Sequence, residues 1–264
     1  MMKKIAIILS LLLVLVSVEA NENSCAIKNQ CFKNGEKVTF YVFYTLAGIW
    51  VHAGNVSFTV NQETLNSKPV YHVIGDGSTN PGYDWIFRVR DRYETYIDTG
   101  SLLPYKFIRN VDEGGYKIFE NVTFNQSSGT AITNKGVFKV PPCVQDVLSE
   151  VYLARNIDFD KYKPEDRIPF DLFLDNEIFH MYVRYLGKET IKTRYGTFRC
   201  IKFKPLLLKG TIFEGGEKMT VWVSDDGNKL PIRIESPISV GSIKVDMMYY
   251  NNLRHPLTSL KDIR

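Results

Sequence analysis

The side chains that could carry out catalysis or bind a metal are scattered along the chain. The histidines His52, His72, His180 and His255 each stand alone, without the HxH or HExxH spacing that holds zinc. Ser149 lies outside any Gly-x-Ser-x-Gly sequence, the turn that exposes the nucleophile of many hydrolases, so we expect an ordinary solvent-facing helix residue. The cysteines show no zinc-binding spacing. The sequence therefore predicts that the protein is not an enzyme and needs no metal or cofactor.

Two charge-dense stretches have simple structural interpretations. The acidic run Asp225–Asn228 lacks the alternating ligands and closing glutamate of a calcium loop, so we expect a β-turn there. The second stretch contains Arg88, Arg90, Asp91, Arg92 and Glu94. Its charges would pair across strands and protect a sheet edge. The alternative is a charged rim that meets a lipid head group or a partner.

Four cysteines, Cys25, Cys31, Cys143 and Cys200, are the disulfide candidates, and they allow three pairings. The favoured prediction joins Cys25 to Cys31 in a small loop. Cys143 would then join Cys200 and clip a helix onto the second half of the chain. The alternative is that Cys143 and Cys200 are buried free thiols, which behave as small hydrophobic residues.

Aromatic residues make up 13% of the chain, more than a sheet with one buried face needs. In a curved sheet some of them would line a cavity beneath a helix, and an apolar cavity is typical of a lipid or acyl-chain site. The candidate ligand-binding residues are Tyr41, Phe43, Trp50, Phe58, Trp85, Phe119, Val147, Val151, Phe179 and Trp222. The alternative is a filled aromatic core.

Residues 1–20 have the pattern of a secretory signal peptide. Lys3 and Lys4 precede an apolar run from Ile5 to Val18, and cleavage is expected near Ala20. The run is too short to favour a membrane anchor, and no later stretch is apolar enough to span a bilayer. We therefore expect an exported protein of the periplasm or envelope. The formal net charge of +4 comes without a Lys/Arg cluster, which argues against nucleic acid as a partner.

One amphipathic helix, over residues 141–156, divides a chain that otherwise reads as strands. Its apolar residues Val144, Val147, Leu148, Val151 and Tyr152 follow the helical period, and Pro141 and Pro142 suit a helix start. Alternating strands fill a first meander over residues 36–140 and a second over 167–250. Because their turns are short, the strands should pair antiparallel. We predict a single mainly β domain over residues 21–264, with one main helix packed on its sheet.

The segment Val221–Ile234, VWVSDDGNKLPIRI, resembles the Trp-x-(Asp/Ser)-x-x-(Gly/Asn)-x-Leu-Pro-x-(Arg/Lys) hairpin of the periplasmic lipoprotein-carrier superfamily. Over most of the chain, ordered motifs are similar to those of an exported Gram-negative family, the domain of unknown function DUF3108. These motifs are GEKVTFYVFY with AGNVSFTV, VRDRYETYID with the later LLP, CVQDVLSEVYLAR, GTFRCIKFKP, VWVSDDGNKLPIRI and SVGSIKVDM. The carrier resemblance implies a strongly curved antiparallel sheet, an open half-barrel, with helical structure on its concave side. The DUF3108 resemblance implies no activity.

The leading functional hypothesis is a non-enzymatic, monomeric exported protein that binds a lipid, another hydrophobic ligand or an envelope component in the half-barrel. It predicts a continuous apolar cavity on the order of a few hundred cubic ångströms. The alternative is a structural or protein-interaction module of the envelope, with a filled core and an exposed apolar patch or sheet edge. An enzyme would instead need carboxylates of perturbed pKa clustered in one cleft.

Overall fold

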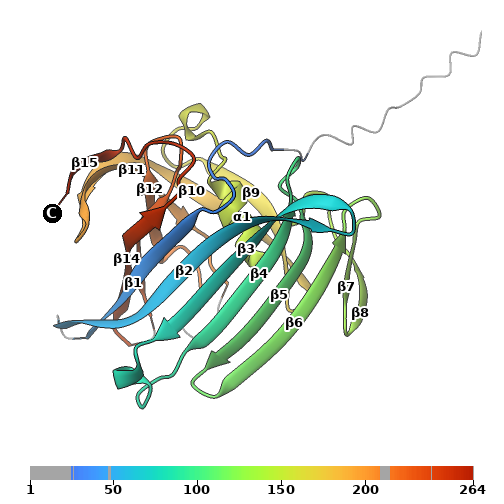
Figure 1. Cartoon of the computed structure of the whole chain (residues 1–264), viewed down its shortest axis with the longest axis horizontal. Helices are drawn as coiled ribbons and strands as arrows, with labels where there is room; N and C mark the ends of the chain where they lie inside the picture. The colour runs from blue at the N-terminus through green and yellow to red at the C-terminus, as the bar shows by residue number, and fades with distance from the viewer. Residues whose placement is uncertain (1–24, 26, 47–48, 209–214, 239, 264) are drawn as a thin grey trace, which may run out of the picture.

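A computed structural model describes residues 25, 27–46, 49–208, 215–238 and 240–263. The predicted signal peptide, residues 1–20, lies outside the described residues. Within them the chain is a 15-stranded, wholly antiparallel sheet that curves strongly around a single α-helix. This confirms the predicted fold class of a mainly β, open half-barrel with one helix (Figure 1).

The first meander has eight strands. They are β1 (Lys37–Leu46), β2 (Ile49–Leu65), β3 (Lys68–Thr79), β4 (Arg90–Asp98), β5 (Pro104–Glu113), β6 (Tyr116–Asn125), β7 (Thr130–Thr133) and β8 (Gly136–Lys139), with the short 3-10 turn η1 (Pro81–Tyr83) between β3 and β4. Each strand pairs with the next. The alternation of the sequence decides which side chains enter the core: on β6, Val122 and Phe124 are buried while Asn121 and Thr123 are exposed.

After α1 (Val147–Ala154) and the 3-10 turn η2 (Phe159–Lys161) comes the second meander. Its strands are β9 (Arg167–Leu174), β10 (Glu177–Lys192), β11 (Gly196–Pro205), β12 (Thr220–Ser224), β13 (Pro231–Pro237), β14 (Ser242–Asn251) and β15 (Leu260–Ile263). β15 pairs with the first residues of β11, at the edge of β11 that faces away from β10. The acidic run forms the predicted turn between β12 and β13, where Asp226 Oδ1 accepts from the Asn228 amide at 3.0 Å.

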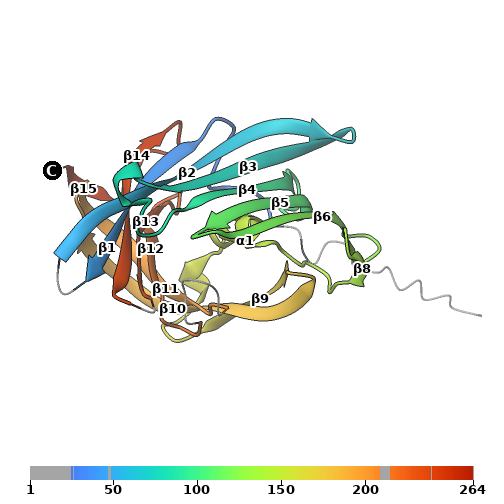
Figure 2. The ribbon, with the colours of Figure 1, turned by 90° about the horizontal axis from the view of Figure 1, so that it is seen from below.

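The two meanders form one sheet because the first strand pairs with the last long one. β1 runs antiparallel to β14, from Lys37 opposite Asn251 to Thr45 opposite Ser242. The strand order therefore runs from β8 to β1, crosses to β14 and ends at β9. Figure 2 shows β9 facing the first meander across the interior that contains α1.

The opening between the two ends of the sheet is partly closed by the segment that leads into α1. The Gln145 amide donates to the Asp171 carbonyl at 2.8 Å, and the Phe173 amide donates to the Gln145 carbonyl at 2.9 Å. Further along, the Thr133 hydroxyl donates to the Asn176 side chain at 2.7 Å. The half-barrel thus stays open as a sheet but is bridged across its mouth.

The predicted helix over 141–156 is too long at its start. The two prolines do not begin it, because the backbone of Gln145 is bonded to β9 as an extended bridge. Asp146 caps the helix instead: its Oδ1 accepts from the amides of Leu148 and Ser149 at 2.9 and 2.8 Å, and the Ser149 hydroxyl accepts from the Asp146 amide at 2.9 Å.

The polar face of α1 is also buried, contrary to the prediction of a solvent-facing Ser149. Gln145, Asp146, Ser149 and Glu150 are all buried, whereas Val151, on the predicted apolar stripe, is partly exposed. The reason is that α1 lies inside the curve of the sheet, against β3, β4 and β9, rather than on an outer surface. Because these polar side chains are buried rather than solvated, α1 is a candidate element of a functional site.

The predicted pairings Cys25–Cys31 and Cys143–Cys200 are both wrong, whereas the alternative of a buried free thiol is confirmed for Cys200. Cys25 is bonded to Cys143, while Cys31 and Cys200 are buried free thiols. Cys200 lies in a core cluster of β1, β11, β12, β13 and β14, whereas the segment around Cys143 belongs to the cluster built on α1. Cys31 lies beside Phe32 in that second cluster, and its thiol donates to the Arg155 carbonyl. Cys200 is therefore held in a different cluster from the segment around its predicted partner, Cys143.

Candidate functional site

A cavity of about 350 Å³ lies between α1 and the inner face of the second meander. Strand alternation explains its lining, because side chains two apart share a face. β9 contributes Phe170, Leu172 and Leu174, and β10 contributes Met181 and Val183. The chain beyond β11 adds Leu206, Leu207 and Leu208.

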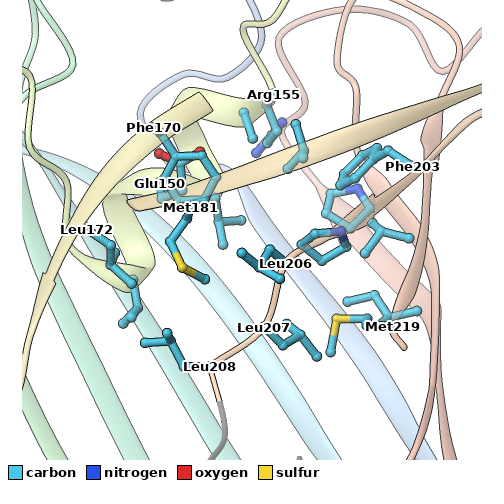
Figure 3. A pocket seen from close by; sticks show the side chains of 18 of the residues that line it. Glu150, Arg155, Phe170, Leu172, Met181, Phe203, Leu206, Leu207, Leu208 and Met219 are labelled. Carbon is cyan, nitrogen blue, oxygen red and sulfur yellow. The ribbon is translucent and has the colours of Figure 1, made fainter. Parts of the chain in front are cut away.

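Aliphatic and aromatic side chains form almost the whole cavity wall, and the polar lining is confined to α1 and its end. Among the described lining residues, only Glu150 and Arg155 carry polar side chains. Figure 3 shows both on the α1 side of the cavity, with Leu208 at the opposite end. The cavity is thus apolar, with polar side chains only on the side of α1.

The carboxyl group of Glu150 is buried without a hydrogen-bond partner for one oxygen. The residue is only 9% exposed, and its Oε2 has no hydrogen-bond partner among the described residues. Burial, and after it the charge of Asp146, raises the pKa of Glu150 well above its usual value. The neutral, protonated form is therefore favoured, which leaves the group one hydroxyl donor and one carbonyl acceptor.

Arg155, the other polar lining residue, is already fully engaged. Its guanidinium contacts the Glu36 carboxylate at 2.5 and 3.0 Å and donates to the Asn228 carbonyl at 3.1 Å. Both Arg155 and Glu36 are buried, so this ion pair fastens the end of α1 to the start of β1. Arg155 therefore has a structural role: it lines the cavity, but its guanidinium is already bonded within the protein.

Asp146, one turn before Glu150, also has a raised pKa but a different role. Burial raises the pKa of Asp146 to about 6. Its Oδ2 accepts from the Thr95 hydroxyl at 2.6 Å, while its Oδ1 caps α1. Asp146 does not line the cavity. The two carboxyl groups therefore do not face a common substrate as an acid–base pair would.

Of the ten predicted ligand-binding residues, the structure brings two, Val147 and Val151, to the cavity wall. Phe58 lies with both of them on a smaller groove of about 260 Å³ that borders β2 and β3. Trp222 is buried in a core cluster, where its indole donates to the Glu189 carboxylate at 2.5 Å. Phe58 therefore lies on the neighbouring groove and Trp222 in the core, and neither lines the cavity.

The other six aromatic residues of the predicted set lie elsewhere and do not line the cavity. Tyr41 stacks on the His52 ring, with 4.1 Å between ring centroids. Phe43 and Trp50 border a charged hollow, under Arg194 at 4.4 Å and Lys244 at 4.5 Å. Three others are placed outside the cavity: Phe179, half-buried, and Trp85 and Phe119, which are 83% and 69% exposed.

The comparisons with known proteins bear on family and fold. The family described as "Protein of unknown function (DUF3108)" matches residues 37–248. The chain belongs to this family. The match runs from the start of β1 through α1 into β14, and it confirms the family resemblance seen in the ordered motifs. Among curated proteins, none was found to match this sequence.

The fold of this DUF3108 protein is similar to that of a beta-barrel-like protein of the domain of unknown function DUF1849 from Brucella abortus. The TM-score is 0.57 at 8% identity, covering 86% of this chain and 99% of the other. A protein from Parabacteroides distasonis aligns with a TM-score of 0.39 at 16% identity, covering 86% and 99%. A protein with a YmcC-like fold from Bacteroides fragilis aligns with a TM-score of 0.34 at 15% identity, covering 86% and 100%. The first similarity concerns the fold alone.

Sequence reasoning missed the residues that give the DUF3108 cavity its character. Glu150 lies off the apolar stripe of the predicted helix, and the apolar run Leu206–Leu208 carries no recognisable motif. The alternation of Phe170, Leu172 and Leu174, and that of Met181 and Val183, is the sequence signal for this apolar face. In the part of the DUF3108 chain that the structure describes, no helix has the length and apolar composition of a membrane crossing.

Proposed function

We propose that this DUF3108 protein is an exported, non-enzymatic protein of the periplasm or envelope that binds a hydrophobic ligand, a lipid or another molecule with an alkyl chain, between α1 and the second meander. The cavity of about 350 Å³ with its apolar wall carries this proposal, because its volume and lining are typical of ligand sites. The lipoprotein-carrier resemblance of the β12–β13 hairpin supports the same class of ligand.

Two features support export. Residues 1–20 have a signal-peptide pattern. The Cys25–Cys143 disulfide suits an oxidising compartment, because cytosolic thiols are kept reduced. We place the cleavage site near Ala20 and expect a monomer.

Native mass spectrometry of the full-length gene product, purified gently from its own periplasm, tests the proposal. We expect an apolar adduct that is lost on denaturation. A matched pair of variants locates it: Ala154→Phe fills the cavity from α1 and should lower adduct occupancy, whereas Ile178→Phe, on exposed β10 surface, should not. Equal occupancy in both variants, or a protein without adduct that also fails to bind added alkyl chains, would contradict the proposal.

A second candidate function, contact with an envelope component, is favoured by an exposed apolar cluster. Trp85 and Ile86 are 83% and 62% exposed, and Phe87 lies against the β5–β6 turn beside exposed Tyr116. Figure 1 places η1 and this turn at the same rim of the sheet. Cosedimentation with anionic vesicles, compared between the wild type and Trp85→Ser/Ile86→Ser, tests this function; equal recovery would argue against a role of the cluster at membranes.

A further inference from the structure

The position of Glu150 narrows the chemistry of the ligand. A buried carboxyl group with an unpaired oxygen costs stability, because it has lost its water without gaining a partner. The terminal torsion of a glutamate side chain is broad and two-fold, so either oxygen can turn toward a ligand. Of the two polar side chains among the described lining residues, Glu150 is the one with an unpaired atom, since Arg155 is held by Glu36 and Asn228.

We propose that the carboxyl group of Glu150 hydrogen-bonds the polar end of a hydrophobic ligand, and that this end is uncharged, such as a hydroxyl or an amide. This inference rests on the proposed ligand site. The ligand would lie with its polar end at α1 and its alkyl chain along Phe170, Met181 and the Leu206–Leu208 run. A hydroxyl or amide both donates and accepts, which complements the donor and acceptor of a neutral carboxyl group.

Charged ends fit the site poorly. An anionic end would need a free cation, but the guanidinium of Arg155 is shared between the Glu36 carboxylate and the Asn228 carbonyl. An ammonium end would require an ionised Glu150 in apolar surroundings, and the desolvation of two ions can exceed their attraction. An ammonium group also has three donors, and the lining offers it no acceptor side chain beyond Glu150.

Three probes with related alkyl chains test the inference: dodecanol, its apolar counterpart n-tridecane, and dodecylammonium. Each probe is titrated against the whole chain without its predicted signal peptide, residues 21–264. Binding is measured as displacement of a neutral naphthylamine dye. Glu150→Met removes the polar group at similar volume, and Glu150→Gln keeps a donor and an acceptor without charge. Glu177→Met, on the exposed start of β10, is the matched control.

We expect Glu150→Met to weaken dodecanol binding about ten-fold, the scale of one hydrogen bond to a buried group, while n-tridecane binds as tightly as before or tighter. Glu150→Gln should retain dodecanol binding, and Glu177→Met should change nothing. Dodecylammonium should bind the wild type more weakly than dodecanol does.

The two proposals fail in distinguishable ways. If the wild type binds neither the dye nor any probe, the ligand site itself is refuted and this inference with it. If the probes bind but Glu150→Met weakens dodecanol and n-tridecane equally, only the role of Glu150 is refuted. If dodecylammonium binds more tightly than dodecanol and loses its affinity in Glu150→Gln, the ligand end is cationic and the uncharged class is wrong.

Discussion

At the residue scale, the buried polar groups around α1 divide into those that hold the helix and one that faces the cavity. Asp146 is bonded to Thr95 on β4, and Arg155 is bonded to Glu36 before β1. Glu150 lies between them on the helix with an unpaired oxygen. Asp146 and Arg155 are thus paired within the protein, whereas Glu150 lines the cavity with one buried oxygen that has no partner among the described residues.

Replacing Glu36 with glutamine should destabilise the protein strongly. The guanidinium of Arg155 would remain buried without its counter-charge, and loss of one partner of a buried ion pair costs about 3–5 kcal/mol. Urea unfolding monitored by tryptophan fluorescence measures the change, with Glu177→Gln on exposed surface as the control. A loss no larger than in the control would mean that the pair contributes little.

Replacing Glu150 with methionine should stabilise the ligand-free protein at neutral pH by about 1–3 kcal/mol, because an unsatisfied buried polar group is removed. The pH dependence has a defined sign. Because the pKa of Glu150 is raised in the folded state, the native protein binds more protons than the unfolded chain above the unfolded pKa of about 4.3, so its stability falls as pH rises from there.

The advantage of Glu150→Met should therefore be smallest near the unfolded pKa of glutamate and should grow toward neutral pH. Thermal unfolding of both proteins across this range measures the difference. A wild type that is the more stable of the two at neutral pH would indicate that Glu150 has a partner in the protein, and it would count against the free carboxyl group.

At the element scale, α1 is short and is positioned by tertiary bonds rather than by its own helical tendency. A helix of eight residues is marginal in isolation. Its start is set by the Asp146 cap and the Gln145 bridge to β9, and its end by Arg155. The Cys25–Cys143 disulfide ties the start of the described chain to the segment before the cap.

Cys25→Ser and Cys143→Ser should each lower stability by about 2–5 kcal/mol, the usual cost of losing a native disulfide. The double variant should match the singles, because both changes remove the same bond. Non-reducing peptide mapping should recover Cys25 linked to Cys143, with Cys31 and Cys200 as free thiols. A Cys25–Cys31 peptide would contradict the structure.

At the scale of the whole molecule, the two meanders enclose α1 in different ways. The first packs directly on the helix, where Val73, Ile97 and Phe107 meet Leu148 and Tyr152 in one cluster. In the second meander β9 also packs on the helix, while side chains of β10 to β13 line the cavity. The larger apolar cavity therefore lies on the side of the second meander, and the smaller groove lies on the side of the first.

The pairing of β1 with β14 should make the protein unfold as one cooperative unit. A sheet shared by both meanders cannot lose one half without exposing the core and strand edge of the other. Urea unfolding followed by tryptophan fluorescence and by far-UV circular dichroism should give coincident single transitions. Two separate transitions would show that residues 36–140 and 167–250 fold as independent domains.

The strands and turns of this protein can be predicted from its sequence alone. Alternating apolar residues and turn residues such as Asp175-Asn176 predict the antiparallel meanders, because strand faces and tight turns depend on neighbouring residues. The ordered motifs also identified the family. The helix start was misjudged, because the bond from Gln145 to β9 and the Asp146–Thr95 contact outweigh the local proline signal.

Only the tertiary structure decided which cysteines pair, which strand face is concave and which residues line the cavity. These features depend on contacts between distant parts of the chain, such as Lys37 with Asn251 and Arg155 with Glu36. Alternation assigns side chains to two faces, but it cannot say which face encloses α1. Glu150, which lies off the apolar stripe of the helix, is a candidate ligand contact only because the sheet curves around the helix and buries its polar face.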